Sequence, residues 1–175
     1  QITASSNLSC NGAGDGTITF EVENFDTTNG FEYDINGSGT FTTSTTSPVT
    51  LTGLAAGSYT IEVRDVLDNS CITTLNQTLT QPALVEASAV LTETLTCSNG
   101  GATITASATG GTPAYEYQLE DNAGGVITAY QSNPVFTGVM AGDYRVRVRD
   151  VNNCSDLTDT DLNVPAVNLI TYAAN

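Results

Sequence analysis

The chain has 175 residues, with 19 acidic residues against four basic ones and no histidine, and its formal net charge at pH 7 is −15. A surface this negative repels nucleic acids and anionic membranes, so neither is expected as a partner. The four basic residues are all arginines, and without lysine or histidine the usual bases and amines of covalent catalysis are absent, so we expect no enzyme.

Short segments of alternating apolar and polar residues predict strands in the first half of the chain. After Cys10 and a glycine-rich turn, residues 17–22 alternate, with Ile18 and Phe20 on one face. Residues 31–35 alternate again before an Asn-Gly turn, and residues 72–79 predict a last strand. No segment shows a helical period, so we expect an all-β fold.

The most regular alternation of the first half lies at residues 54–65, where Leu-Ala-Ala-Gly leads into Tyr59, Ile61 and Val63. Period-two alternation is typical of a strand with one buried face, so these three side chains are predicted to point inward. The glycine two residues before the tyrosine allows a sharp turn into the strand. The pattern is typical of a tyrosine corner, in which the phenol bonds back to nearby backbone, and Tyr59 is the predicted corner residue.

The second half of the chain repeats the first. Residues 139–150 contain the same Gly-x-Tyr stretch, which predicts Tyr144 as a second corner residue with Val146 and Val148 inward. Matching residues are shifted by 83 to 86 positions: Ile18 and Ile104, Tyr33 and Tyr117, Gly57 and Gly142, Asp65 and Asp150, Pro82 and Pro165. This repeat predicts two domains, 1–82 and 83–175. Evenly spaced short strands predict two tandem immunoglobulin-like Greek-key β-sandwiches of about seven strands each.

The four cysteines occupy matching positions, Cys10 and Cys71 in the first half and Cys97 and Cys154 in the second. Four cysteines allow three pairings, and the internal repeat favours one disulfide per domain, Cys10–Cys71 and Cys97–Cys154. Each bridge would close a loop of about 60 residues and stabilise a small domain by roughly 4 kcal/mol. Free thiols are the alternative. Disulfides would imply export to an oxidising space.

The motifs of both halves resemble those of a known repeat. Each half matches part of a series that runs Cys-x-Gly, Gly-x-Ile, Tyr-x-Tyr, Leu-x-x-Gly-x-Tyr-x-Val-x-Val-x-Asp, Asn-x-Cys and Pro-x-Leu. This pattern is similar to the SprB-type repeats, which occur in tandem in large gliding-motility and cell-surface adhesins of Bacteroidetes. The first half departs from it at Asp68-Asn69-Ser70-Cys71, where the family usually has Asn-Gly-Cys; the second half has Asn152-Asn153-Cys154.

The resemblance implies a non-catalytic structural repeat pair of a cell-surface adhesin filament that extends adhesive or gliding machinery from the cell. It also implies export by the type IX secretion system to the outer-membrane-associated cell surface. The implied partners are neighbouring repeats of the same chain and surface polysaccharide or the substratum. The chain starts at Gln1 without methionine and shows no signal peptide, so two units of a longer array are expected. No apolar run is long enough to span a bilayer, so membrane insertion is not expected.

Acidic turns follow the two central predicted strands and give a candidate calcium site. Asp65 and Asp68 lie in the first turn, and Asp150 and Asn152 lie in the second. Calcium prefers clustered carboxylate and amide oxygens. Asp and Asn also favour plain turns through local hydrogen bonds, so both interpretations stay open. No other cofactor is expected.

Three arginines, Arg145, Arg147 and Arg149, share the outward face of one predicted strand. The simpler interpretation is a ladder of ion pairs with acids on neighbouring strands, each pair contributing roughly a few tenths of a kcal/mol. The alternative interpretation is a binding patch for an acidic polysaccharide.

Two further features of the sequence concern carbohydrate. Asp26-Thr27-Thr28 resembles the O-glycosylation motif of exported Bacteroidetes proteins, which makes Thr27 a candidate glycosylation site. The alternative function for the whole chain is a carbohydrate-binding module of a secreted enzyme or a surface glycan-binding protein. Such a module usually presents exposed aromatic rings, whereas the chain has no tryptophan, and only Tyr130 and Tyr172 fall outside the inward and corner patterns.

Overall fold

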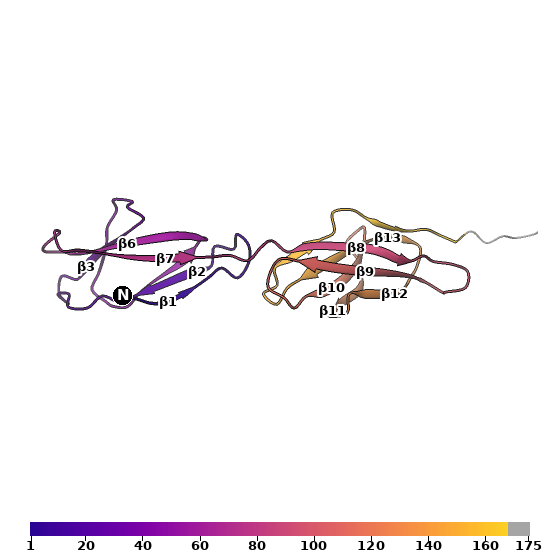
Figure 1. Ribbon diagram of the computed structural model, residues 1–175, viewed down its shortest axis with the longest axis horizontal. Helices are drawn as coiled ribbons and strands as arrows, with labels where there is room; N and C mark the ends of the chain where they lie inside the picture. The colour runs from indigo at the N-terminus through magenta and orange to yellow at the C-terminus, as the bar shows by residue number, and fades with distance from the viewer. Residues whose placement is uncertain (168–175) are drawn as a thin grey trace, which may run out of the picture. The chain divides into compact units, whose positions relative to one another are not determined.

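The computed structural model of the protein describes residues 1–167, which form β-strands joined by turns and loops (Figure 1). These residues contain fifteen strands in four sheets and no helix. Residues 1–167 therefore include no helix of the length and apolarity that crossing a membrane requires. The chain divides into two compact units, the first Gln1–Pro82 and the second beginning at Ala83. The all-β prediction is confirmed.

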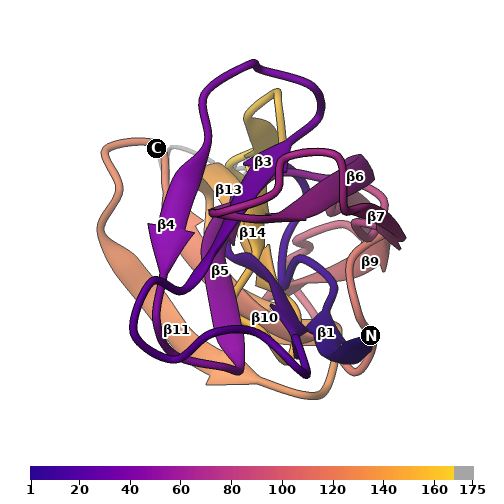
Figure 2. The ribbon, with the colours of Figure 1, turned by 90° about the vertical axis from the view of Figure 1, so that its left-hand side faces the viewer.

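The first unit contains seven strands, β1 (Ile2–Ser6), β2 (Gly16–Phe20), β3 (Phe31–Ile35), β4 (Thr42–Ser44), β5 (Val49–Leu54), β6 (Gly57–Asp65) and β7 (Ile72–Leu79). They form a three-stranded sheet, β1-β2-β5, and a four-stranded sheet, β4-β3-β6-β7. All neighbouring strands pair antiparallel. Figure 2 looks along this unit, with β3, β6 and β7 on one side and β1 and β5 on the other.

Apolar side chains from both sheets of the first unit meet between them, because each strand alternates inward apolar with outward polar residues. The buried members are Leu8, Ile18, Phe20, Phe31, Ile61, Val63 and Leu79. Tyr59 is partly buried against this cluster. The inward face predicted for Ile61 and Val63 is therefore confirmed.

The second unit contains eight strands within the described residues, β8 (Glu86–Glu93), β9 (Ala102–Thr109), β10 (Glu116–Asp121), β11 (Val126–Gln131), β12 (Val135–Val139), β13 (Gly142–Arg149), β14 (Ser155–Leu157) and β15 (Leu162–Val164). One sheet has the order β12-β9-β8 and the other the order β11-β10-β13-β14, with β15 also paired to β13. The core of this unit again lies between its sheets and includes Ile104, Leu119, Phe136, Tyr144, Val146, Val148 and Val164.

The two units share one strand order, in which β8 to β13 take the places of β1 to β6. They differ at the last strand. In the first unit β7 pairs with β6 without a break from Gly57↔Leu79 to Arg64↔Ile72. In the second unit this strand is interrupted, so that β14 pairs with one half of β13 and β15 with the other. The interruption comprises residues 158–161, of which Thr158 is buried and residues 159–161 are exposed.

Each unit has a leading end, where the chain enters it, and a trailing end, where the chain leaves it. At the trailing end of the first unit, the Leu8 N–H donates to the Thr80 carbonyl at 3.0 Å. The Thr80 N–H in turn donates to Asn7 Oδ1 at 2.9 Å. The arrows of β1 and β7 point the same way in Figure 1, toward this trailing end. These bonds therefore join the ends of two strands that belong to different sheets.

At the leading end of the second unit, the Gly111 N–H donates to the Ala83 carbonyl at 2.9 Å. Gly110 has a φ of +72°, and a Cβ atom on it would lie 1.7 Å from the Leu84 carbonyl oxygen. Only glycine fits both the positive φ and this approach of two backbones.

The strand predictions differ from the structure mainly in the second unit. The last strand of the first unit, residues 72–79, coincides with β7. The strand β11 was not predicted, because it is an edge strand whose residues are exposed or only half-buried on both faces, so it lacks a clear alternation.

Candidate functional site

The strands β6 and β13 are the centre of the two larger sheets, and each begins with a tyrosine that bonds back to the preceding turn. Tyr59 Oη donates to the Ala55 carbonyl at 2.9 Å. Tyr144 Oη donates to the Met140 carbonyl at 3.1 Å. The Tyr144 side chain is buried, whereas Tyr59 is half-buried. Both tyrosines therefore fix the turn that precedes a central strand.

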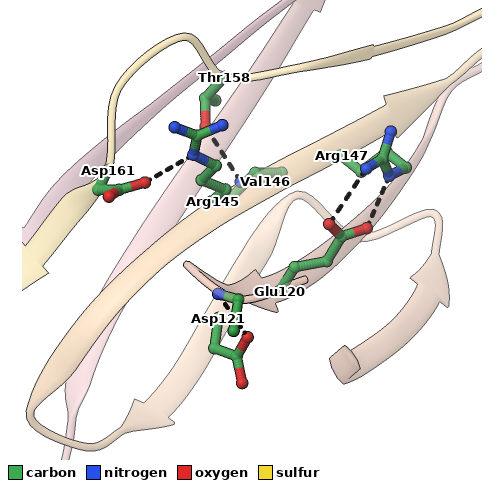
Figure 3. Close-up of polar contacts among 8 residues, drawn as sticks. Glu120, Asp121, Arg145, Val146, Arg147, Thr158 and Asp161 are labelled. Carbon is green, nitrogen blue, oxygen red and sulfur yellow. Dashed lines mark hydrogen bonds and ion pairs between the residues drawn. The ribbon is translucent and has the colours of Figure 1, made fainter. Parts of the chain in front are cut away.

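The outward face of β13 carries Arg145, Arg147 and Arg149, and each of these arginines meets an acid (Figure 3 shows the first two). The Arg145 Nε lies 2.6 Å from Asp161 Oδ1. Arg147 donates to both carboxylate oxygens of Glu120, from Nε at 2.6 Å and from Nη2 at 3.2 Å. Arg149 Nη2 lies 2.6 Å from Glu116 Oε2.

The Arg147–Glu120 pair differs from its neighbours in burial. The Glu120 side chain is only 7% exposed, whereas the Asp161 and Glu116 side chains are 40% and 46% exposed. Bidentate pairing with Glu120 raises the pKa of the Arg147 guanidinium above its usual range. The sequence places Glu120 on an outward face, but it does not show that neighbouring side chains cover it.

The interruption between β14 and β15 positions the acid that meets Arg145. Thr158 is buried, its Oγ1 accepts a hydrogen bond from the Val146 N–H at 3.2 Å, and its own N–H donates to the Val146 carbonyl at 3.1 Å (Figure 3). This bonding holds the segment against β13 where the ladder would otherwise be open. Asp161 follows three residues later, beside Arg145.

The first unit repeats part of this arrangement. Arg64 Nη2 lies 2.7 Å from Glu32 Oε2, and its guanidinium lies 3.4 Å from the ring centre of Phe41. In the second unit the guanidinium of Arg149 lies 4.0 Å from the ring centre of Tyr130. Each unit thus places an ion-paired arginine over a half-buried aromatic ring at the edge of the same sheet, Phe41 just before β4 and Tyr130 in β11.

All four arginines of the chain are ion-paired within their own units. A guanidinium already satisfied by a carboxylate has less to offer an acidic polysaccharide. The geometry therefore favours the ladder interpretation over the binding patch.

The acidic turns after β6 and β13 hold their own backbone. Asp65 Oδ1 accepts from the N–H groups of Leu67 and Asp68 at 2.7 and 3.0 Å. Asp68 Oδ1 accepts from both the N–H and the hydroxyl of Ser70, and these bonds lower the pKa of Asp68 below its usual value. The first acidic turn is thus an ordinary Asx-type turn.

The second acidic turn is more deeply buried. Asp150 is 4% exposed, its Oδ1 accepts from the N–H groups of Asn152 and Cys154 at 2.9 Å each, and its Oδ2 accepts from the Thr112 N–H at 2.7 Å. Within residues 1–167 no cluster of three or more His, Cys, Asp or Glu side chains could hold a metal ion. The predicted calcium residues lie in two separate turns, Asp65 and Asp68 where β6 ends and Asp150 and Asn152 after β13. Because the Asp65 and Asp150 carboxylates accept hydrogen bonds from backbone N–H groups, the geometry favours plain turns over a calcium site.

The predicted disulfides Cys10–Cys71 and Cys97–Cys154 are wrong. Cys71 and Cys97 carry free, exposed thiols. Cys10 and Cys154 are disulfide-bonded. The structure of each unit explains why its own two cysteines do not meet.

In the first unit Cys10 and Cys71 lie at opposite ends of β7. Cys10 is next to Asn11, whose Nδ2 donates to the Pro82 carbonyl at 3.0 Å, so it lies at the trailing end. Cys71 directly precedes β7, at the leading end. The eight residues of β7 hold the two ends roughly 26 Å apart at about 3.3 Å per residue. Bridged cysteines need Cα atoms within about 7 Å.

The second unit has the same arrangement. Cys154 lies beside Asp150 and Thr112 at the leading end. Cys97 lies in the β8–β9 loop, next to the start of β9, where Ala102 pairs with Val139. The length of β9, eight residues, separates the two cysteines.

The buried carboxylate of Asp34 holds the turn that follows β3. Asp34 is 3% exposed, and its carboxylate accepts hydrogen bonds from the Ser38 hydroxyl and from the N–H groups of Ile35 and Gly39. These bonds, that of Ser38 first, lower its pKa below the usual 3.8. Sequence reasoning missed Asp34, although the Asn-Gly turn that follows it signals a tight loop.

Thr27 is exposed on a turn, and its glycosylation stays a prediction.

A comparison with protein-family models finds one match. Residues 92–124 match the SprB repeat. The matched residues include β9 and β10 of the second unit, so the predicted resemblance is confirmed there. A search of curated proteins finds no match. Tyr172, outside the described residues, also lies outside the SprB match.

Solved structures with a similar fold include the three N-terminal domains of the Highly Immunogenic Outer Capsid protein (Hoc) of bacteriophage RB49, with a TM-score of 0.51 and 17% identity over 93% of this chain and 59% of that one. A C-terminal fragment of intimin, in complex with the translocated intimin receptor, gives a TM-score of 0.45 at 15% identity over 94% of this chain and 64% of that one. The four N-terminal Ig domains of Dscam1 give 0.36 at 16% identity over 93% and 42%. The chain spans less than two thirds of each. The likeness to Hoc supports the fold alone.

Proposed function

We propose that the protein is a pair of non-catalytic structural repeats from a large exported adhesin at the cell surface. The SprB repeat match at residues 92–124 carries this proposal, together with the strand order that the first unit shares with the matched unit. SprB-type repeats are typical of cell-surface proteins, and disulfide-bonded cysteines suit a space outside the cytoplasm. Export by the type IX secretion system, association with the outer membrane and a place in a gliding or adhesive filament complete the proposal.

The proposed architecture is an immunoglobulin-like Greek-key sandwich in each unit. Its support is the strand order of the first unit, in which β1-β2-β5 forms one sheet and β4-β3-β6-β7 the other. The chain therefore changes sheets between β2 and β3, between β4 and β5 and between β5 and β6. Connections of this kind are typical of the immunoglobulin fold.

Surface labelling of intact cells tests the proposed function. An epitope tag inserted in the exposed Asn122–Gly125 turn should be reached by gold-labelled antibody on unbroken cells, and external protease should remove the label. A tag that antibody reaches only after lysis would contradict the proposal.

The alternative function, a carbohydrate-binding module, has weaker support from the geometry. Of the two tyrosines that fall outside the inward and corner patterns, Tyr172 lies outside the described residues. Tyr130 is half-buried and has the guanidinium of Arg149 over one face, and Phe41 in the first unit is covered in the same way by Arg64. Sugar-binding platforms instead leave an aromatic face open to the ligand. A glycan array probed with the 175-residue chain should give no signal above a protein blank. A strong, competable signal would favour the module, and the Tyr130→Ala variant would then show whether this ring is responsible.

A further inference from the structure

Each unit carries one cysteine at its leading end and one at its trailing end. Cys71 and Cys154 are the leading-end cysteines, and Cys10 and Cys97 are the trailing-end cysteines. They occupy equivalent places in the shared strand order, before the last strand or its first piece (β7, β14) and in the loop after the first strand (β1, β8). The strand between the two cysteines of a unit keeps them too far apart to bond to each other.

Both kinds of position take part in disulfide chemistry. Cys154, a leading-end cysteine, and Cys10, a trailing-end cysteine, are disulfide-bonded. Their equivalents Cys71 and Cys97 are free and exposed. The backbone of Cys71 is paired as that of bonded Cys154 is: the Asp65 N–H donates to the Cys71 carbonyl at 3.3 Å, and the Asp150 N–H donates to the Cys154 carbonyl at 3.0 Å.

We propose that Cys71 and Cys97 bond to cysteines of further copies of the repeat, a leading-end cysteine to a trailing-end cysteine. This inference rests on the proposed function, since it requires repeats in tandem. The partner at each end of a unit is another repeat of the same fold. One disulfide would join the two repeats, and neither repeat would contain a disulfide between its own two cysteines.

The surroundings of Cys71 suit a second copy. Beside it lies a pocket of about 360 Å³ lined by residues that include Val22, Phe25 and Phe31. Ile72, the next residue, is 52% exposed, and Leu67 in the preceding turn is 71% exposed. Apolar surface of this kind at the end of a unit provides contact area for a neighbouring loop.

The bond can be formed by exchange with a low-molecular-weight disulfide, such as oxidised glutathione. The thiolate of one cysteine attacks the glutathione disulfide and releases one glutathione thiolate. The thiolate of the partner cysteine then attacks the mixed disulfide and releases the second. Two protein thiols are oxidised to one disulfide, one glutathione disulfide is reduced to two thiols, and the two thiol protons pass to the solvent or the released thiolates.

The test uses the 175-residue chain and two single variants, Cys71→Ser and Cys97→Ser. Each variant alone can form only a symmetric dimer, Cys97–Cys97 or Cys71–Cys71. An equal mixture can also form the Cys71–Cys97 dimer, which random collision would make about half of all dimers. After exchange with oxidised glutathione, non-reducing electrophoresis and peptide mapping should find the mixed dimer in several-fold excess over both symmetric dimers together. The unmodified chain should form a ladder of higher oligomers.

Random proportions, an excess of either symmetric dimer, or no dimer under conditions that oxidise small thiols would overturn the inference. A double variant, Cys71→Ser/Cys97→Ser, should stay monomeric and retain the melting temperature of the parent chain, which controls for misfolding. None of these outcomes depends on where the protein is displayed, so the surface-labelling experiment can succeed or fail independently.

Discussion

The guanidinium of Arg147 spans the buried carboxylate of Glu120 with two hydrogen bonds, of 2.6 and 3.2 Å. Removing the partner of a buried charged group destabilises a protein more than removing the partner of an exposed one, since the remaining charge is left uncompensated away from water. The same strand face offers a comparison, because Arg145 meets Asp161 where both side chains are more than a third exposed.

Replacing Arg147 with alanine should destabilise the second unit more than replacing Arg145. The expected cost of Arg147→Ala is about 1–2 kcal/mol, since hydrogen bonds to charged groups are strong but the guanidinium is partly exposed. The matched Arg145→Ala change should cost less than about 0.5 kcal/mol. Urea melts of the two variants give the comparison. Equal costs would show that burial of Glu120 adds nothing.

The hydroxyl of Tyr144 and its ring should contribute separately. Tyr144→Phe removes the bond to the Met140 carbonyl and keeps the ring, so about 1 kcal/mol should be lost. Tyr144→Ala removes a buried aromatic ring and should cost roughly 3–5 kcal/mol. Tyr59→Phe in the first unit is the matched control for the hydroxyl. Denaturant melts give the free energy of unfolding of each variant. If Tyr144→Phe were as unstable as Tyr144→Ala, the hydroxyl and the ring would not contribute separately.

The stability of the first unit should contain a component that disappears in acid. The pKa of Asp34 lies below its unfolded value near 3.8, chiefly because of the Ser38 hydroxyl. A folded-state pKa that is depressed gives stability above the unfolded pKa, and this is lost as the pH falls through the folded value. The melting-temperature gap between the parent chain and Asp34→Asn should therefore be widest at neutral pH and narrow below about pH 4. A gap that widens in acid would have the wrong sign.

The reactivity of Cys71 should depend on its acidic neighbour. Cys71 Sγ lies 3.7 Å from Asp68 Oδ2, and the Asp68 charge is the main cause that raises the thiol pKa above its usual 9.0. Because the thiolate is the reactive form, Asp68→Asn should speed alkylation of Cys71 at pH 8. Cys97 in the same molecule provides the control and should react at an unchanged rate. Mass spectrometry of partly alkylated protein separates the two sites.

The buried faces of the central strands could be predicted from the sequence because alternation reports directly on burial. Ile61, Val63, Val146 and Val148 are all inward as the pattern predicts. The disulfide pairing could not be predicted in the same way. An internal repeat shows which cysteines are equivalent, but it does not show at which end of a strand each one lies, and a strand of eight residues is several times longer than a disulfide can reach.

The candidate surface was only partly predictable for a similar reason. The arginines of β13 were placed correctly on one face, since side chains of a strand alternate. The bidentate pairing of Glu120 with Arg147 joins β10 to β13, and the position of Asp161 beside Arg145 depends on the break between β14 and β15. Both are contacts between strands that are distant in sequence, and no local pattern encodes them.

The hydrogen bonds that join Leu8 and Asn7 to Thr80 bear on how the first unit would resist pulling. They connect the two strands nearest its chain ends, β1 and β7, which point in the same direction. A force applied through the two chain ends would load these bonds together in shear rather than open them one at a time like a zipper. Forced unfolding is governed by the unfolding rate, so loss of the Asn7 side-chain bond should lower the rupture force of this unit in single-molecule stretching, even where equilibrium stability changes little.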